Sequence, residues 1–119
     1  MNKKKAFYAH CVSIYDTKQE ERDLELLNKL GYEVFNPNKP EYSKMYKELG
    51  MMASVKFIND CDVLAFSALP GGHIPAGVYK EIMIASDKSI PIFEIPMFSL
   101  RKIMTVNDTR AYIKEVGKR

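Results

Sequence analysis

The sequence predicts a single small α/β domain, in which helices cover both faces of a mostly parallel sheet of four to five strands. Short apolar runs alternate along the chain with longer segments whose apolar residues recur every three or four positions, as in amphipathic helices. The apolar runs are nearly continuous, which is typical of strands buried on both faces. Strands that alternate with helices form right-handed crossovers, so we expect a doubly wound, three-layer sheet.

We expect the first strand over residues 6–13. Thr17 and Glu20 have the spacing of a capping box, which predicts that a helix begins there. Leucines at intervals of three continue this helix, and Gly31 is expected to end it. The second strand is expected over residues 32–36, before two prolines stop it.

A helical apolar pattern follows over residues 42–58, and Gly50 is expected to bend or break it. The third strand is expected over residues 62–68. After a Pro-Gly-Gly turn, Pro75 suits the first turn of a helix that runs to about residue 86. The fourth strand is expected over residues 90–95.

The rest of the chain contains an ambiguous segment, residues 99–104, and one more expected helix. Thr105 and Asp108 are spaced to cap that helix, which would run through residue 116 and end at Gly117.

Size and composition limit the classes of protein to which the chain can belong. Its 119 residues suit one domain, spanning residues 1–119, that is large enough to form a core without disulfides or metal. The net charge of +3 lies partly in basic runs at the two ends, which predict solvated tails and no polymeric nucleic acid partner. The chain has neither an apolar segment after its basic start nor an apolar run of about 20 residues. We therefore expect no signal peptide, no membrane partner and a cytoplasmic location.

The two cysteines, Cys11 and Cys61, are expected to be free thiols in a reducing compartment. They lie in apolar contexts and lack the spacing of zinc ligands, so no metal site is predicted.

The most informative stretch for function is 61–82, a strand, a Gly-rich loop and a helix that carries Glu81. This junction lies at the carboxyl end of a strand, where α/β proteins bind ligands. The backbone of Gly71 and Gly72 allows a close approach, and the helix N-terminus offers N–H groups to ribose or phosphate, with help from Ser67. A carboxylate placed there is a candidate nucleophile, although an exposed Glu favoured by the helix dipole is the alternative.

Other polar residues are expected at the same edge of the sheet: Tyr8, His10, Tyr15, Asn36, Asn38 and His73. Either histidine belongs to the residue type that most often protonates a leaving group near neutral pH. Each also has a structural interpretation. Tyr8 and His10 suit a core, Asn36 suits a turn beside a proline, and His73 suits an exposed loop.

Four segments together resemble the nucleoside 2-deoxyribosyltransferase superfamily, including its small nucleoside-monophosphate N-glycosidase relatives. They span most of the chain, and their order and spacing match the first three strands and the catalytic helix of that family. The segments are AFYAH at 6–10, LGYEVFNP at 30–37, NDCDVLAF at 59–66 and AGVYKEIMIA at 76–85.

The resemblance implies a Rossmann-like fold with Glu81 as the catalytic nucleophile. It places Tyr8 and His10 beside the sugar and Gly77 in the helix motif that precedes the nucleophile. It further implies a homo-oligomer with shared active sites, a nucleoside or nucleotide substrate, and no nicotinamide or other cofactor.

The predicted reaction is hydrolysis of an N-glycosidic bond, or transfer of the (deoxy)ribosyl group, on a nucleoside, nucleotide or related N-riboside. Bond cleavage develops positive charge at the anomeric carbon, which a carboxylate stabilises or captures. Relatives carry acidic residues where this chain has Ser67 and Pro75. The alternative is therefore a nucleotide-binding or sensing module without turnover. A receiver-like domain is disfavoured, because Ser13 and Ser67 end the strands where such a domain needs an Asp.

Overall fold

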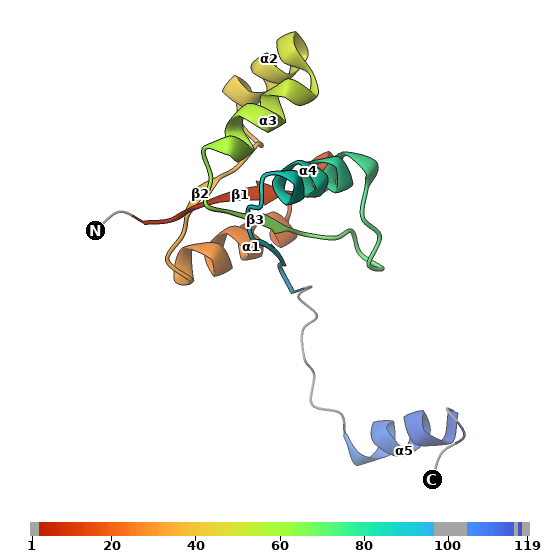
Figure 1. The fold of residues 1–119 in the computed structure, drawn as a ribbon. Helices are drawn as coiled ribbons and strands as arrows, with labels where there is room; N and C mark the ends of the chain where they lie inside the picture. The colour runs from red at the N-terminus through yellow and green to blue at the C-terminus, as the bar shows by residue number, and fades with distance from the viewer. Residues whose placement is uncertain (1–2, 97–104, 116, 118–119) are drawn as a thin grey trace.

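A computed structural model describes residues 3–96, 105–115 and 117 (Figure 1). It confirms a small Rossmann-like α/β fold, whose sheet has four parallel strands in the order β2-β1-β3-β4. The strands are β1 (Lys5–Ala9), β2 (Glu33–Phe35), β3 (Val63–Phe66) and β4 (Ile92–Glu94).

Five α-helices and one short 3-10 helix, η1, complete the described part of the chain. In Figure 1, α1 lies on one side of the sheet and α4 on the other, with α2 and α3 projecting beyond them. None of these helices is long and apolar enough to cross a membrane. Their bounds are η1 (Val12–Ile14), α1 (Lys18–Lys29), α2 (Pro40–Leu49), α3 (Met51–Asn59), α4 (Ala76–Asp87) and α5 (Val106–Glu115).

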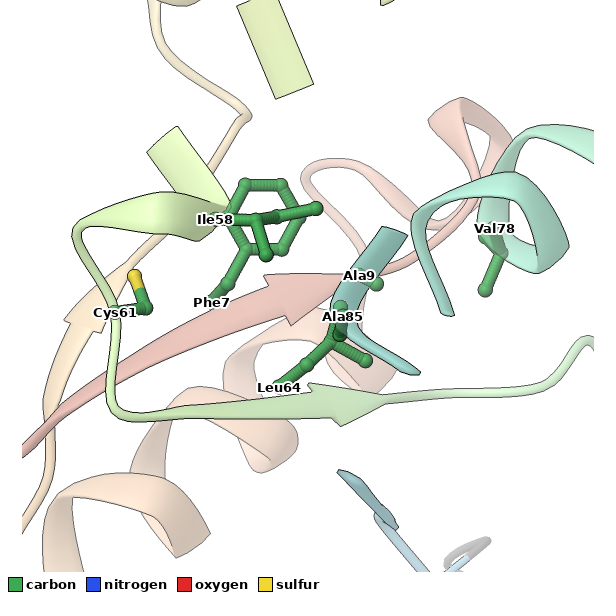
Figure 2. Close-up of a cluster of buried hydrophobic side chains, with 7 residues drawn as sticks. All are labelled: Phe7, Ala9, Ile58, Cys61, Leu64, Val78 and Ala85. Atoms are coloured by element: carbon green, nitrogen blue, oxygen red, sulfur yellow. The ribbon is translucent and has the colours of Figure 1, made fainter. Parts of the chain in front are cut away.

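The core lies on both faces of the central strand β1, because successive side chains of a strand point to opposite faces. On one face, Phe7 packs with Ile58 of α3 and Ala85 of α4 (Figure 2). On the other face, Tyr8 packs with Leu27 of α1. All five of these side chains are fully buried. The central strand is therefore sandwiched between two helical layers, as the continuous apolar runs predicted.

The first strand is shorter than the expected 6–13. β1 ends at Ala9, and the chain turns into η1 (Val12–Ile14) through local hydrogen bonds, such as the one from the Ile14 amide to the Cys11 carbonyl at 2.9 Å. Val12 is 73% exposed, so an apolar side chain in this run does not mark a strand. The other three strands are also shorter at their ends than expected.

The predicted cap of the first helix is confirmed, with one difference. Thr17 is the N-cap of α1, and its side-chain oxygen accepts a hydrogen bond from the Glu20 amide at 3.4 Å. The Glu20 carboxylate does not return to the Thr17 amide as in a capping box. It accepts instead from the Asp16 amide at 3.2 Å. Gly31 follows the helix with a φ of +89°, as a helix-ending glycine does.

The last expected helix is present as α5 (Val106–Glu115). Thr105 caps it by accepting a hydrogen bond from the Asp108 amide at 3.1 Å. No residue of α5 is buried, and in Figure 1 the helix lies apart from the sheet. The ambiguous segment 99–104 lies outside the described residues.

Gly50 breaks the long helical pattern into two helices, as predicted. Its φ of 61° and ψ of −139° end α2 and let α3 begin at the next residue. Only glycine adopts this backbone conformation without strain. The pair α2 and α3, residues 40–59, is called the α2–α3 hairpin below.

We predict that Gly50→Ala destabilises the protein by about 1–3 kcal/mol, because a side chain is strained at this φ and ψ. Open space surrounds the position, so the backbone alone should account for the loss. Gly77→Ala is the matched control: Gly77 is helical, equally open and has no positive φ, so this change should stabilise by about 0.5–1 kcal/mol. Urea unfolding measures both changes, and a neutral Gly50→Ala would contradict this explanation of the break.

Candidate active site

A cavity of about 550 Å³ lies at the carboxyl edge of the sheet. Its walls come from the segments that follow β1 and β2, from the α2–α3 hairpin and from the start of α4. The strand order reverses between β1 and β3, and such a switch point is where open α/β sheets bind ligands. The lining residues are His10, Cys11, Val12, Tyr15, Pro37, Asn38, Tyr42, Ser43, Tyr46, Lys47, Met51, Pro75, Gly77, Val78 and Glu81.

Glu81 is the buried carboxylate of this cavity. It lies in the second turn of α4 and is only 9% exposed, so the exposed first-turn alternative is wrong. Its Oε2 atom accepts hydrogen bonds from the Ser54 hydroxyl at 3.0 Å and from the Tyr42 hydroxyl at 3.5 Å. The two hydroxyls lie 2.6 Å from each other. The α2–α3 hairpin therefore holds one oxygen of the carboxylate from two helices.

The second oxygen of Glu81, Oε1, is available to a ligand. It accepts no hydrogen bond from any described residue, yet no buried side-chain oxygen or nitrogen in the described ranges lacks a partner. Oε1 must therefore reach solvent, and Glu81 lines the cavity. Ser54 and Tyr42 thus anchor Oε2, whereas Oε1 is open to the cavity.

Burial raises the pKa of Glu81 to about 7, although the hydrogen bonds from Ser54 and Tyr42 act in the opposite direction by favouring the charged form. At neutral pH both forms of the carboxyl group are therefore populated. A carboxyl group poised in this way is typical of catalytic sites.

The helix pattern explains why Glu81 points inward. The buried residues of α4 are Val78, Glu81 and Ala85, which are three and four positions apart and so share one face. A carboxylate takes the place of an apolar residue in the buried stripe. This signal is readable in the sequence.

His10 lines the cavity, but both of its ring nitrogens are already engaged. Nε2 lies 2.8 Å from Glu20 Oε2, and Nδ1 lies 3.1 Å from the carbonyl oxygen of Tyr8. The ring stacks on that of Tyr8 with centroids 3.7 Å apart. Burial lowers the pKa of His10, against the opposing effect of the Glu20 carboxylate. The structure thus places His10 in the wall without a nitrogen directed at a ligand.

A polar contact between loops borders the same cavity, and sequence reasoning missed it. The Asn38 side-chain amide lies 3.1 Å from Asp16 Oδ1 and from both oxygens of Glu20. It ties the loop after β2 to the start of α1. Burial acts to raise the pKa of Glu20, but hydrogen bonds from His10, the Asp16 amide and Asn38 outweigh it and lower this pKa. The Glu20 carboxylate therefore stays charged.

Tyr8 and Ser67 do not line the cavity. The Tyr8 hydroxyl donates to Asp23 Oδ2 at 2.5 Å, and Ser67 Oγ accepts from the Gln19 amide at 2.8 Å. Both residues are buried, and their partners come from α1. Burial raises the pKa of Asp23, although the Tyr8 hydrogen bond opposes this. These polar groups stabilise the contact between α1 and the sheet.

The Gly-rich loop also lies outside the cavity lining. Gly71, Gly72 and His73 are exposed, and the loop closes on itself through a hydrogen bond from the Leu69 amide to the His73 carbonyl at 2.8 Å. The chain reaches the cavity only after this loop, at Pro75 and Gly77. The connection between β3 and α4 therefore leaves the edge of the sheet and returns to it only where α4 begins.

Asn36, which follows β2, has a turn role. Its side-chain oxygen accepts a hydrogen bond from the Asn38 amide at 2.9 Å. Of the predicted site residues, the structure brings Glu81, His10, Tyr15, Asn38 and Gly77 to the cavity and leaves the others outside its lining. Tyr42 and Ser54 are the functional candidates that the sequence did not indicate.

Comparisons with models of known families, with curated proteins and with solved structures gave no match. Within residues 3–96, 105–115 and 117, no group of three or more His, Cys, Asp or Glu side chains is arranged to hold a metal ion.

We predict that Glu81 makes the protein less stable as the pH rises. A folded-state pKa of about 7, above the ordinary 4.5, means that the native state holds this proton more tightly than the unfolded chain. The contribution is fully present below pH 4.5 and is lost as the pH rises through 7. The pKa difference corresponds to about 3 kcal/mol at about 1.4 kcal/mol per pKa unit.

The measurement compares the free energy of unfolding of the wild type and of Glu81→Gln at pH 4 and pH 8. Between these values the wild type should lose about 3 kcal/mol relative to the variant, because the neutral amide does not titrate. Equal pH dependence in the two proteins would show that Glu81 is not a perturbed buried acid.

Proposed function

We propose that this protein cleaves an N-glycosidic bond, or transfers the (deoxy)ribosyl group, with Glu81 as the nucleophile. The observation that carries the proposal is that the two oxygens of the Glu81 carboxylate have different environments. Ser54 anchors Oε2, and Oε1 is open to the cavity. A nucleophile needs one free oxygen in a fixed direction.

The cavity suits a nucleoside or nucleotide in size and lining. Its volume of about 550 Å³ lies within the range of small-molecule sites, which is roughly 300–1,000 Å³. Tyr15, Tyr42 and Tyr46 line it and offer aromatic surfaces on which a base can stack. The resemblance of four segments to nucleoside 2-deoxyribosyltransferases supports the same class of substrate.

In the proposed reaction, Glu81 acts as a carboxylate. As the bond from the sugar to the base breaks, positive charge grows on the anomeric carbon, and Oε1 stabilises it or bonds to it. Ser54 and Tyr42 keep Oε2 on the wall, so that Oε1 faces the sugar. Water then attacks the same carbon and completes hydrolysis, or a second base completes transfer.

The second candidate is a nucleotide-binding module without turnover. One observation favours it: Ser67, which stands where related transferases carry an acid, is hydrogen-bonded to Gln19 and does not line the cavity. The cavity therefore lacks that route for protonating a leaving base. Release of free base distinguishes an enzyme from a binding module.

We further propose that the protein works as a homo-oligomer in the cytoplasm. Tyr79 and Met83 lie one turn apart on α4 and are 55% and 42% exposed, which suits a contact with a second copy. Cys11 and Cys61 are free, as expected in a reducing compartment.

The test is a chromatographic assay for free base with a panel of ribo- and deoxyribonucleosides, their monophosphates, and ribosides of cationic bases such as nicotinamide riboside. Wild type should release base, or exchange it with an added second base, and Glu81→Gln should lower the rate by about 100-fold or more. Glu33→Gln is the matched control, because Glu33 is exposed at the amino end of β2 and outside the cavity. If no compound in the panel loses its base, while nucleotides still raise the melting temperature, the binding module replaces the enzyme.

A further inference from the structure

The charge of the leaving base determines whether the site must supply a proton to it. When a neutral nucleoside is cleaved, the base departs as an anion unless an acid protonates it in the transition state. A base that carries a fixed positive charge needs no proton, because the electron pair of the breaking bond neutralises that charge. The proton donors around the cavity therefore indicate which kind of base the site can release.

Three of the titratable groups in the lining are poor donors. Both nitrogens of His10 face acceptors, Glu20 Oε2 at 2.8 Å and the Tyr8 carbonyl at 3.1 Å. Burial raises the pKa of Tyr15 to about 12, and it raises the pKa of Tyr42 as well, so both phenols hold their protons at neutral pH.

Four further titratable groups line the cavity, namely Glu81, Tyr46, Lys47 and Cys11. Glu81 must be ionised to act as a nucleophile and then has no proton to give. Tyr46 and Lys47 contribute to the lining from the last turn of α2, and both are exposed to solvent. Cys11 is the one remaining thiol of the lining, and its role is testable by substitution.

The aromatic and acidic groups of the cavity favour a cation, whereas the Lys47 ammonium at its exposed side opposes one. The rings of Tyr42 and Tyr46 lie with centroids 6.1 Å apart on one side, and those of His10 and Tyr15 lie 4.9 Å apart on another. Aromatic faces attract cations, and the attraction grows when water is excluded. The free oxygen of Glu81 adds a negative charge to the same space.

We propose that the substrate is an N-riboside whose base carries a fixed positive charge, such as a pyridinium or an N-alkylated purine. This inference rests on the proposed function of Glu81. The bond from the anomeric carbon to the base nitrogen breaks, and its electron pair passes to the nitrogen, which leaves as a neutral base. Glu81 Oε1 bonds to the anomeric carbon. Water then displaces the carboxylate, so that ribose, the neutral base and one proton are the products.

The first experiment measures recognition of charge without any reaction. 1-Methylnicotinamide is a pyridinium cation, and 3-methylbenzamide is its neutral counterpart of the same shape. By NMR titration, the cation should bind the wild type about tenfold more tightly than the neutral compound. Glu81→Gln should reduce this preference, and Glu33→Gln should retain it. Equal affinities in the wild type would overturn the proposal.

The second experiment separates this proposal from the function on which it rests. Nicotinamide riboside, uridine and adenosine are incubated with the wild type and with Glu81→Gln, and the ratio of the two rates is compared for each substrate. The ratio should be about 100 or more for the pyridinium riboside and near 1 for the neutral nucleosides. Comparable ratios for all three would overturn the preference for a cationic base and leave the glycosidase function intact. A ratio near 1 for all three would overturn both.

Cys11→Ala decides whether the thiol supplies a proton. Loss of its thiol should leave the shape of the pH–rate profile for nicotinamide riboside unchanged, because no proton is required at the base. If the wild type cleaves uridine and Cys11→Ala abolishes only that activity, Cys11 is a general acid and the proposed substrate class is wrong.

Discussion

The hydrogen bond from Ser54 to Oε2 of Glu81, 3.0 Å long, is the interaction on which the candidate site depends. A carboxylate that is only 9% exposed is costly unless polar groups surround it. Ser54 and Tyr42 offset part of that cost at one oxygen, and the other oxygen reaches the cavity. The same bond joins α4 to the α2–α3 hairpin, so the position of the hairpin and the state of the acid are physically linked.

The two faces of the central strand, β1, support different parts of the site. Phe7 belongs to the apolar cluster beneath the helices that carry Glu81 and Ser54. Tyr8 and His10 point the other way, into a buried polar network with Asp23 and Glu20. This network fixes one wall of the cavity through a strand and a helix, which are more rigid supports than a loop.

Much of the fold was predictable because its signals are local. Apolar periodicity predicted the four strands and their alternation with helices, Thr17 predicted the start of α1, and Gly50 predicted the break after α2. Glu81 was also accessible to sequence reasoning, because it follows a buried strand and occupies the apolar stripe of its helix. The glycines of the expected cradle, Gly71 and Gly72, lie in a loop that closes on itself and do not line the cavity.

The partners of Glu81 were not predictable, since they depend on the packing of distant helices. Ser54 lies 27 positions before Glu81 in the chain, and a serine in an apolar helix has no local feature that assigns it to a carboxylate. The same is true of the contact between Asn38 and Glu20. A parallel sheet brings such residues together only after its crossovers have formed, so tertiary structure alone reveals them.

The most direct test of the central claim is an NMR titration of the side-chain carboxyl carbon of Glu81, with Glu81→Gln used for assignment. In the wild type the midpoint should lie near pH 7, and in Ser54→Ala it should move higher, because the hydrogen bond that favours the charged form is lost. A midpoint near 4.5 that Ser54→Ala does not change would contradict a buried carboxylate anchored by the α2–α3 hairpin.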